Sequence, residues 1–206
     1  MKRIAGTGLL TAAALALMVA LPAQAGSHGG GKAMKAGADA EVQQLATEAK
    51  QIVKGFFTEL KGTLVGAMKK DGPAGAVDVC AKKAHEITLR HNRDGWEVGR
   101  TALKLRNPNN APDAWEKAVL EEFEQKIAAG ADPKKLAKAE IVEQDGRKVF
   151  RFMKAIPTGK PCLTCHGDKV DPALLQKIRS YYPDDQATGF TLGQLRGAFT
   201  LSKPLN

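Results

Sequence analysis

The sequence contains few aromatic residues, few cysteines and no internal repeat. Aromatic residues make up 5% of its 206 residues, and its basic residues are interspersed with acidic ones. Although the net charge is +9, this pattern does not indicate nucleic-acid binding, which favours clustered basic residues. The charge is compatible with an acidic partner or a membrane surface, and by itself it does not select a function.

Long apolar runs are also missing, apart from residues 8–21. This run is shorter than the ~20 apolar residues that a membrane-spanning helix needs. It follows Lys2 and Arg3 and precedes the small residue Ala25, which is the pattern of a cleaved secretory signal. We therefore predict a signal peptide over 1–25, export to the periplasm and no stable membrane span after cleavage. Removing Lys2 and Arg3 lowers the net charge from +9 to +7.

The remainder is long enough for one domain with a substantial core. Residues 26–39 are rich in glycine and predict a flexible tether. We place the domain at residues 40–206.

The spacing of apolar residues predicts an α+β fold. Steps of three and four predict a long amphipathic helix over 40–68, which Gly72 and Pro73 terminate. Apolar spacing and turn residues predict the remaining elements: helices over 75–89, 113–130 and 172–182, a strand over 96–106, a hairpin over 138–157 and one or two strands near the C-terminus. Because the strands lie close together in sequence, we expect a small antiparallel sheet with helices on one side.

Only three cysteines are present, and two of them lie in the stretch Cys162-Leu-Thr-Cys165-His166. This is the attachment signature of c-type haem. Two thiols at this spacing can each add to a vinyl group of one porphyrin, and the adjacent histidine then supplies the proximal iron ligand. The motif predicts one covalent haem c, with thioethers at Cys162 and Cys165 and His166 as axial ligand.

Three alternatives compete with haem. A thioredoxin-type pair belongs in a β-α-β unit, which is not predicted before this motif. A structural zinc site needs a second pair of ligands at metal spacing. A disulfide between Cys162 and Cys165 is possible in an exported protein, but it explains neither His166 nor the remaining cysteine, Cys80.

The second axial ligand is not decided by the motif. The candidates are Cys80, His85, His91, Met34, Met68 and Met153, or no residue at all. We expect the two histidines at the surface and Met153 in the core. Cys80 shares a predicted helix face with Ala76 and Ala84, whose small side chains would let a porphyrin approach. An inert, buried cysteine is the alternative.

Basic residues of the predicted strand could complete the site. The period of two places Arg100, Lys104 and Arg106 on one face, where they could pair with the two haem propionates. An ordinary solvated basic face is the alternative.

Four stretches resemble a bacterial family that was long classed as a domain of unknown function. They are VCAKKAHEI from Val79, GWEVGRTALKLRNPNNAPDAWE from Gly95, PCLTCHG from Pro161 and YPDDQATGFTLGQLRGAFTLS from Tyr182. The family is described as haem-c-binding and PAS-like, so the resemblance implies a PAS-like antiparallel sheet flanked by helices, with a long N-terminal helix. It also implies histidine and cysteine as axial ligands, with Cys80 in the cysteine position.

These observations predict an exported monohaem c-type cytochrome acting in electron transfer or redox response, with an unidentified redox partner protein. The alternative is a haem-based sensor that binds a small diatomic ligand or senses redox state. We do not expect an enzyme, because no distal acid-base pair is evident in the sequence.

Overall fold

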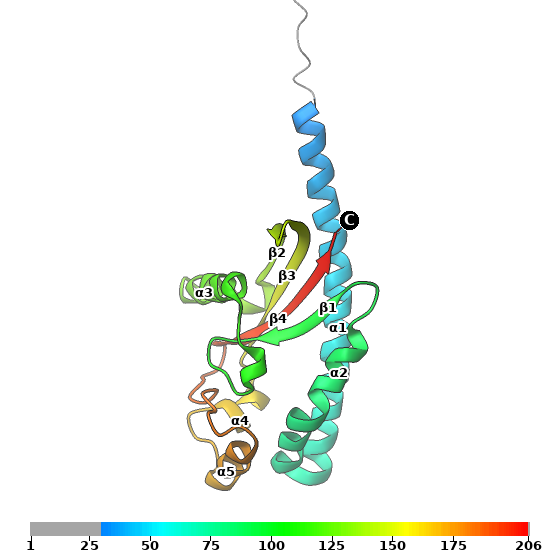
Figure 1. Cartoon of the computed structure of the whole chain (residues 1–206). Coiled ribbons are helices and arrows are strands. Elements are labelled where there is room, and N and C mark those ends of the chain that lie inside the picture. The colour runs from blue at the N-terminus through cyan, green and yellow to red at the C-terminus, as the bar shows by residue number, and fades with distance from the viewer. Residues whose placement is uncertain (1–29, 206) are drawn as a thin grey trace, which may run out of the picture.

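A four-stranded antiparallel sheet flanked by helices forms the centre of the computed structural model, which describes residues 30–205 (Figure 1). The sheet has the order β1-β4-β3-β2 and consists of β1 (Glu97–Thr101), β2 (Ala137–Gln144), β3 (Arg147–Pro157) and β4 (Leu195–Pro204). The helices are α1 (Gly30–Asp78), α2 (Ala84–His91), α3 (Ala114–Ala128), α4 (Leu163–His166) and α5 (Pro172–Tyr181). The α+β prediction is confirmed, and the arrangement is consistent with a PAS-like fold.

The long N-terminal helix begins earlier than expected. α1 starts at Gly30, inside the segment 26–39 that was predicted to be a flexible tether. The rest of that segment and the expected signal peptide, 1–25, lie outside the described residues. None of the helices within residues 30–205 has the length and apolarity that crossing a membrane requires.

α1 and α2 form a helical hairpin. The helical path breaks at Gly72, which has a φ of 68° and precedes Pro73, so the predicted break is confirmed. The chain then returns through a π-helical turn (Val79–Lys83) into α2, where His91 Nε2 lies 2.9 Å from Glu59 Oε2 on α1. The predicted single helix over 75–89 is therefore interrupted by a π-turn.

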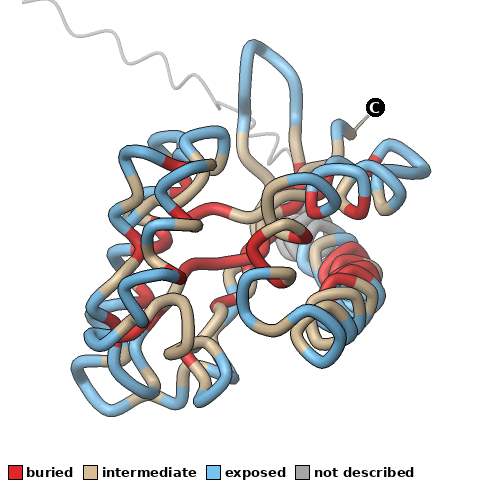
Figure 2. Tube along the Cα trace, turned by 90° about the horizontal axis from the view of Figure 1, so that it is seen from below, coloured by how far each residue is buried: buried red, intermediate tan, exposed pale blue. Residues whose placement is uncertain are grey.

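Helices cover both faces of the sheet, whereas the sequence predicted helices on one side only. The cluster that joins α1 and α2 to the sheet includes Phe56, Ile87, Trp96, Phe150, Phe152, Phe199 and Leu201. The opposite cluster joins α3 to the sheet and includes Val119, Leu120, Phe123, Met153, Ala155 and Ala198. Because alternate residues of β3 and β4 enter different clusters, both strands are buried on both faces over their middle parts (Figure 2).

The hairpin and the third helix are confirmed. β2 and β3 are joined by Asp145 and Gly146, which both have positive φ, as a two-residue turn of this type requires. α3 begins with a capping box between Asp113 and Glu116. The C-terminal segment forms one strand, β4, rather than two.

The strand predicted over 96–106 is too long. β1 ends at Thr101, because the chain beyond it turns away from β4 and bonds to another segment. Lys104 Nζ donates to the carbonyl oxygen of Thr188 at 2.6 Å, and Arg106 Nη2 donates to that of Cys165 at 2.6 Å. These tertiary bonds hold the segment as a loop that points towards the cysteine motif.

Candidate functional site

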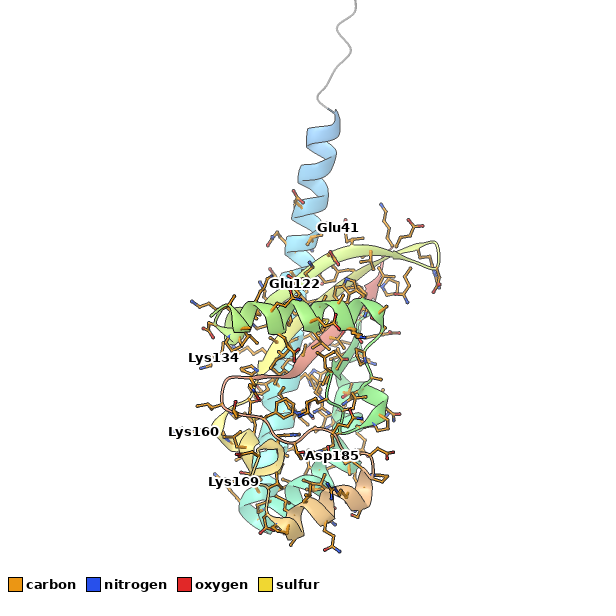
Figure 3. The ribbon with its side chains drawn as sticks, turned by 90° about the vertical axis from the view of Figure 1, so that its left-hand side faces the viewer. Glu41, Glu122, Lys134, Lys160, Lys169 and Asp185 are labelled. Carbon is orange, nitrogen blue, oxygen red and sulfur yellow. The ribbon has the colours of Figure 1, made fainter. Side chains whose placement is uncertain are left out.

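The cysteine motif lies in a short helical segment at one end of the molecule, beside α5 and the returning part of the helical hairpin (Figure 1). Figure 3 labels Lys160 and Lys169, which flank the motif, and Asp185 at the same end. Cys162 and Cys165 are both partly buried free thiols. The disulfide considered as an alternative is therefore not formed in this structure.

His166 is held in the form that binds metals. Its Nδ1 lies 2.7 Å from the carbonyl oxygen of Ala187. Because a carbonyl oxygen only accepts, Nδ1 carries the proton and the lone pair remains on Nε2. Burial and, after it, the charges of Arg196 and Arg106 lower the pKa of His166 to about 3. A neutral imidazole with its second nitrogen bonded to a carbonyl is the arrangement typical of metal-ligating histidines.

Cys80 lies in the π-helical turn at the far end of the helical hairpin. Tyr181, the last residue of α5, and Tyr182, which follows it, hold this turn. The Tyr182 hydroxyl donates a hydrogen bond to the Cys80 carbonyl oxygen at 3.2 Å, and the Tyr181 hydroxyl donates one to Asp78 Oδ1 at 2.7 Å. Single π-turns inside helices occur frequently at functional sites. The turn was not predicted, because the sequence gives no periodic signal for one extra residue in a helix.

The structure brings Cys80 into the neighbourhood of the cysteine motif. Burial raises the pKa of Cys165, and the nearby Cys80 adds to that rise. Ala81, next to Cys80, packs with Cys165 against one apolar cluster that includes Val77 and Ile178. Burial also raises the pKa of Cys80 itself, against the influence of three arginines that are described below.

The methionine candidates for the second axial position lie elsewhere or are not described. Met153 is fully buried beneath α3, on the opposite face of the sheet from the helical hairpin, so its predicted core role is confirmed. Met68 is partly buried near the end of α1, before the chain reverses. The side chain of Met34 lies outside the described part of the structure.

The histidine candidates divide between surface and interior. His85 is exposed, as predicted. His91 is not a surface residue, because its side chain is only 14% exposed. Its Nε2 lies 2.9 Å from Glu59 Oε2, and its ring packs 5.5 Å from that of Phe56. His91 therefore belongs to the contact between α1 and α2.

Arg106 organises the backbone around the motif. Its guanidinium makes two contacts of 3.0 Å to the side-chain oxygens of Asp185 and also donates to the carbonyl oxygens of Cys165 and Ala187. The Asp185 carboxylate is fully buried and compensates the charge of Arg106. Arg106 thus links the loop after β1, the motif and the segment that orients His166.

The three predicted basic residues do not share one strand face. Arg100 lies on β1 and is partly buried, whereas Lys104 and Arg106 lie in the loop beyond it. Lys104 is exposed, and its Nζ lies 4.9 Å from the centroid of the Phe190 ring. The predicted shared strand face is therefore wrong, because β1 ends before Lys104 and Arg106, and the pairing of the three residues with haem propionates stays a prediction.

Arg196 was missed by the sequence analysis. Its Nε lies 3.3 Å from His166 Nδ1, and its guanidinium lies 5.3 Å from the centroid of Phe190. The Phe190 ring in turn stands edge-on to the His166 ring at 6.3 Å. Arg196, Phe190, Asp185 and Tyr182 all lie in the C-terminal stretch that carried the family resemblance, which was the available signal.

The same three arginines surround both candidate iron ligands. Arg100, Arg106 and Arg196 each influence the pKa of Cys80 and that of His166. Within the described residues, no three side chains of His, Cys, Asp or Glu form a group that could hold a metal ion on their own. The site therefore combines two free thiols, one oriented imidazole, a third thiol and a group of partly buried cations.

Comparison with known proteins adds a family and a related structure. Residues 32–204 match the family model described as Tll0287-like. The structure also resembles the crystal structure of the cyanobacterial heme-protein Tll0287, with a TM-score of 0.56 and 26% sequence identity. This match covers 78% of the present chain and 96% of the other. No match was found among curated proteins.

Proposed function

The chain belongs to the Tll0287-like family, and from this premise we propose that it is an exported monohaem c-type cytochrome. The similar solved structure is that of a haem protein, which supports haem as the cofactor. The observation that carries the proposal is the meeting of Cys80, from the helical hairpin, with a Cys-x-x-Cys-His motif more than eighty residues later.

The residues present fit a covalent haem. Cys162 and Cys165 are free thiols at the spacing that two thioether bonds require. His166 keeps the Nε2 lone pair that an iron ligand needs, because its Nδ1 donates to the Ala187 carbonyl. Cys80 would be the second axial ligand. Bound haem would supply a one-electron change between ferric and ferrous iron.

The polypeptide's contribution is to position and tune these groups. Asp185, Arg106 and the Ala187 carbonyl form one hydrogen-bonded unit that fixes the orientation of the His166 ring. The three arginines near Cys80 oppose part of the rise in its pKa that burial causes, so they reduce the cost of a thiolate there without removing it. A thiolate ligand favours ferric iron, which predicts a low reduction potential.

Electron transfer or redox response is the activity that this site supports best. We propose a periplasmic location, an unidentified redox partner protein and no substrate turnover. The positive net charge, +7 after removal of Lys2 and Arg3 with the proposed signal peptide, suits an acidic partner.

A sensor of redox state or of a diatomic ligand is the second candidate. The observation that favours it is the π-turn at Cys80, because a π-turn inside a helix is a local irregularity that can change register. Release of Cys80 on reduction would then free one axial position.

An absorption spectrum of protein produced with c-haem maturation tests the proposal. We expect pigment that remains with the polypeptide in acidified acetone, and a six-coordinate ferric spectrum. An electron carrier should stay six-coordinate on reduction and should not bind CO. In a sensor, Cys80 should dissociate from the iron on reduction, and CO should then bind. Colourless protein, or pigment extracted by acidified acetone, would overturn the assignment of covalent haem.

A further inference from the structure

Two arginines at the cysteine end have no acidic partner in the described part of the chain. Arg100 lies on β1 and Arg196 lies at the start of β4. Neither makes an ion pair with a described carboxylate, whereas the neighbouring Arg106 pairs with Asp185 at 3.0 Å. Arg196 is held instead by the Lys104 carbonyl oxygen at 3.3 Å and by the face of Phe190.

The contact between Arg196 and His166 does not compensate the charge. Because Nδ1 of His166 donates its proton to the Ala187 carbonyl, the Nε–H of Arg196 meets another donor at 3.3 Å. Burial, together with the charges of Arg106 and Arg100, lowers the pKa of Arg196 to about 10. The described structure therefore gathers the guanidinium groups of Arg100, Arg106 and Arg196 near one carboxylate, that of Asp185, which already pairs with Arg106.

Arg100 is in a similar position on the neighbouring strand. Its guanidinium carbon lies 5.9 Å from the centroid of Phe56, and burial lowers its pKa. Cys80 and Tyr182 oppose this shift, and neither is a carboxyl group. Arg100 thus lies near enough to Cys80 to influence its pKa, while Arg196 contacts the His166 ring directly.

Buried charges are costly unless they are paired. An unpaired ion in a protein interior costs several kcal/mol, and breaking a buried pair typically costs ~3–5 kcal/mol. Two neighbouring, partly buried guanidinium groups that have no carboxylate partner of their own among the described residues are therefore expected where a ligand supplies the anions. Guanidinium binds carboxylates through two parallel hydrogen bonds, which makes a carboxylate the best-matched anion.

We propose that Arg100 and Arg196 form a site for two carboxylates and that each binds one propionate of the haem. This inference rests on the proposed function, since it takes the haem as the ligand. Of the predicted residues Arg100, Lys104 and Arg106, this proposal keeps only Arg100. Arg196 takes the place of the other two. Arg106 is compensated by Asp185, and Lys104 is exposed and bonded to the Thr188 carbonyl.

The experiment compares Arg100→Gln, Arg196→Gln and the control Arg90→Gln in the haem-loaded full chain. Arg90 lies on α2, is half exposed and pairs with Glu59, so the control removes the same charge away from the site. Covalent haem is first measured in acidified acetone, followed by the midpoint potential and the propionate bending bands in the resonance Raman spectrum. Arg100→Lys and Arg196→Lys are measured in the same way.

We expect each Gln variant to keep covalent haem, to change one propionate band and to lower the midpoint potential. The potential falls because an uncompensated propionate stabilises ferric iron. The two shifts should add in the double variant, and the Lys variants should recover part of each. Arg90→Gln should match the wild type in both measurements.

Unchanged Raman bands and potentials in haem-loaded Arg100 and Arg196 variants would overturn this inference and leave the cytochrome assignment intact. If a Gln variant does not fold, the propionate bands of the corresponding Lys variant test the inference instead, because lysine keeps the charge but cannot form the two parallel hydrogen bonds. A Lys variant with unchanged propionate bands counts against the site. Wild-type protein without covalent haem would instead overturn the proposed function.

Discussion

Two arginine sites in this protein, one buried and one partly buried, are built in opposite ways. Beneath α3, Arg151 is only 8% exposed and pairs with Asp113 at 2.7 Å and with Glu116 at 3.3 Å. At the cysteine end, Arg100 and Arg196 have no such partners among the described residues. The first site carries its own anions, although Arg151 Nε finds no hydrogen-bond partner among the described residues, so its role is structural. The second is short of negative charge, as the proposed binding of two carboxylates requires.

Changes at the cysteine end should affect the cofactor, and changes beneath α3 should affect folding stability. The largest effect is expected for the double variant Cys162→Ala/Cys165→Ala. Without either thiol no thioether bond can form, so covalent haem should be lost completely. Haem staining of denaturing gels measures this directly. Pigment that stays bound to the denatured double variant would contradict the assigned linkage.

Cys80→Ala separates the role of the proposed axial ligand from that of the two cysteines that would form thioether bonds. The variant should keep covalent haem, because both thioether positions remain, but its ferric spectrum and spin state should change through the loss of an axial ligand. Absorption and electron paramagnetic resonance spectra give the readout. A ferric spectrum identical to that of the wild type would remove Cys80 from the iron.

Arg151→Met tests the site beneath α3. Removing one partner of a buried ion pair leaves the other uncompensated, so we expect a loss of about 3 kcal/mol in the free energy of unfolding. Urea titration measures the loss, and the haem spectrum and potential should not move. Arg147→Gln, an exposed position on the same strand, should change stability by less than about 0.5 kcal/mol.

The result can be checked by combining changes. If the cost comes from the uncompensated Glu116, Arg151→Met should cost less when Glu116 is already Gln. A shift in midpoint potential with Arg151→Met would break the comparison, because both arginine sites would then act on the cofactor.

The smallest effect is expected at the tyrosines that hold the π-turn. Tyr182→Phe removes the hydroxyl that donates to the Cys80 carbonyl and should cost about 1 kcal/mol. Tyr181→Phe should cost less, because its partner Asp78 is 39% exposed and can bond to water. Denaturant titration of the two variants, side by side, gives the difference. Equal losses would show that the two contacts are equivalent.

Much of the fold could be predicted from local pattern. The break at Gly72-Pro73, the hairpin over 138–157 and the helix that starts near Asp113 each depend on a few neighbouring residues, and each is confirmed. The end of β1 at Thr101 could not be predicted in this way. It depends on bonds from Lys104 and Arg106 to carbonyl groups more than fifty residues away along the chain.

The candidate site divides along the same line. The Cys162-x-x-Cys165-His166 motif is a local pattern whose spacing defines its chemistry. Arg196 carries no such pattern, and its closeness to His166 arises because β4 pairs with β1 and passes the motif. The helices on both faces of the sheet were missed as well, since strand periodicity does not show which helix covers which face.

The sequence alone determined which residues can bond to a haem, because the spacing of the two thiols and the adjacent imidazole is fixed by the order of residues along the chain. Only the tertiary structure decided which nitrogen of His166 is free, where Cys80 lies and which arginines lack an anion. The physical reason is that hydrogen-bond direction and charge compensation depend on groups that folding brings together from distant parts of the chain.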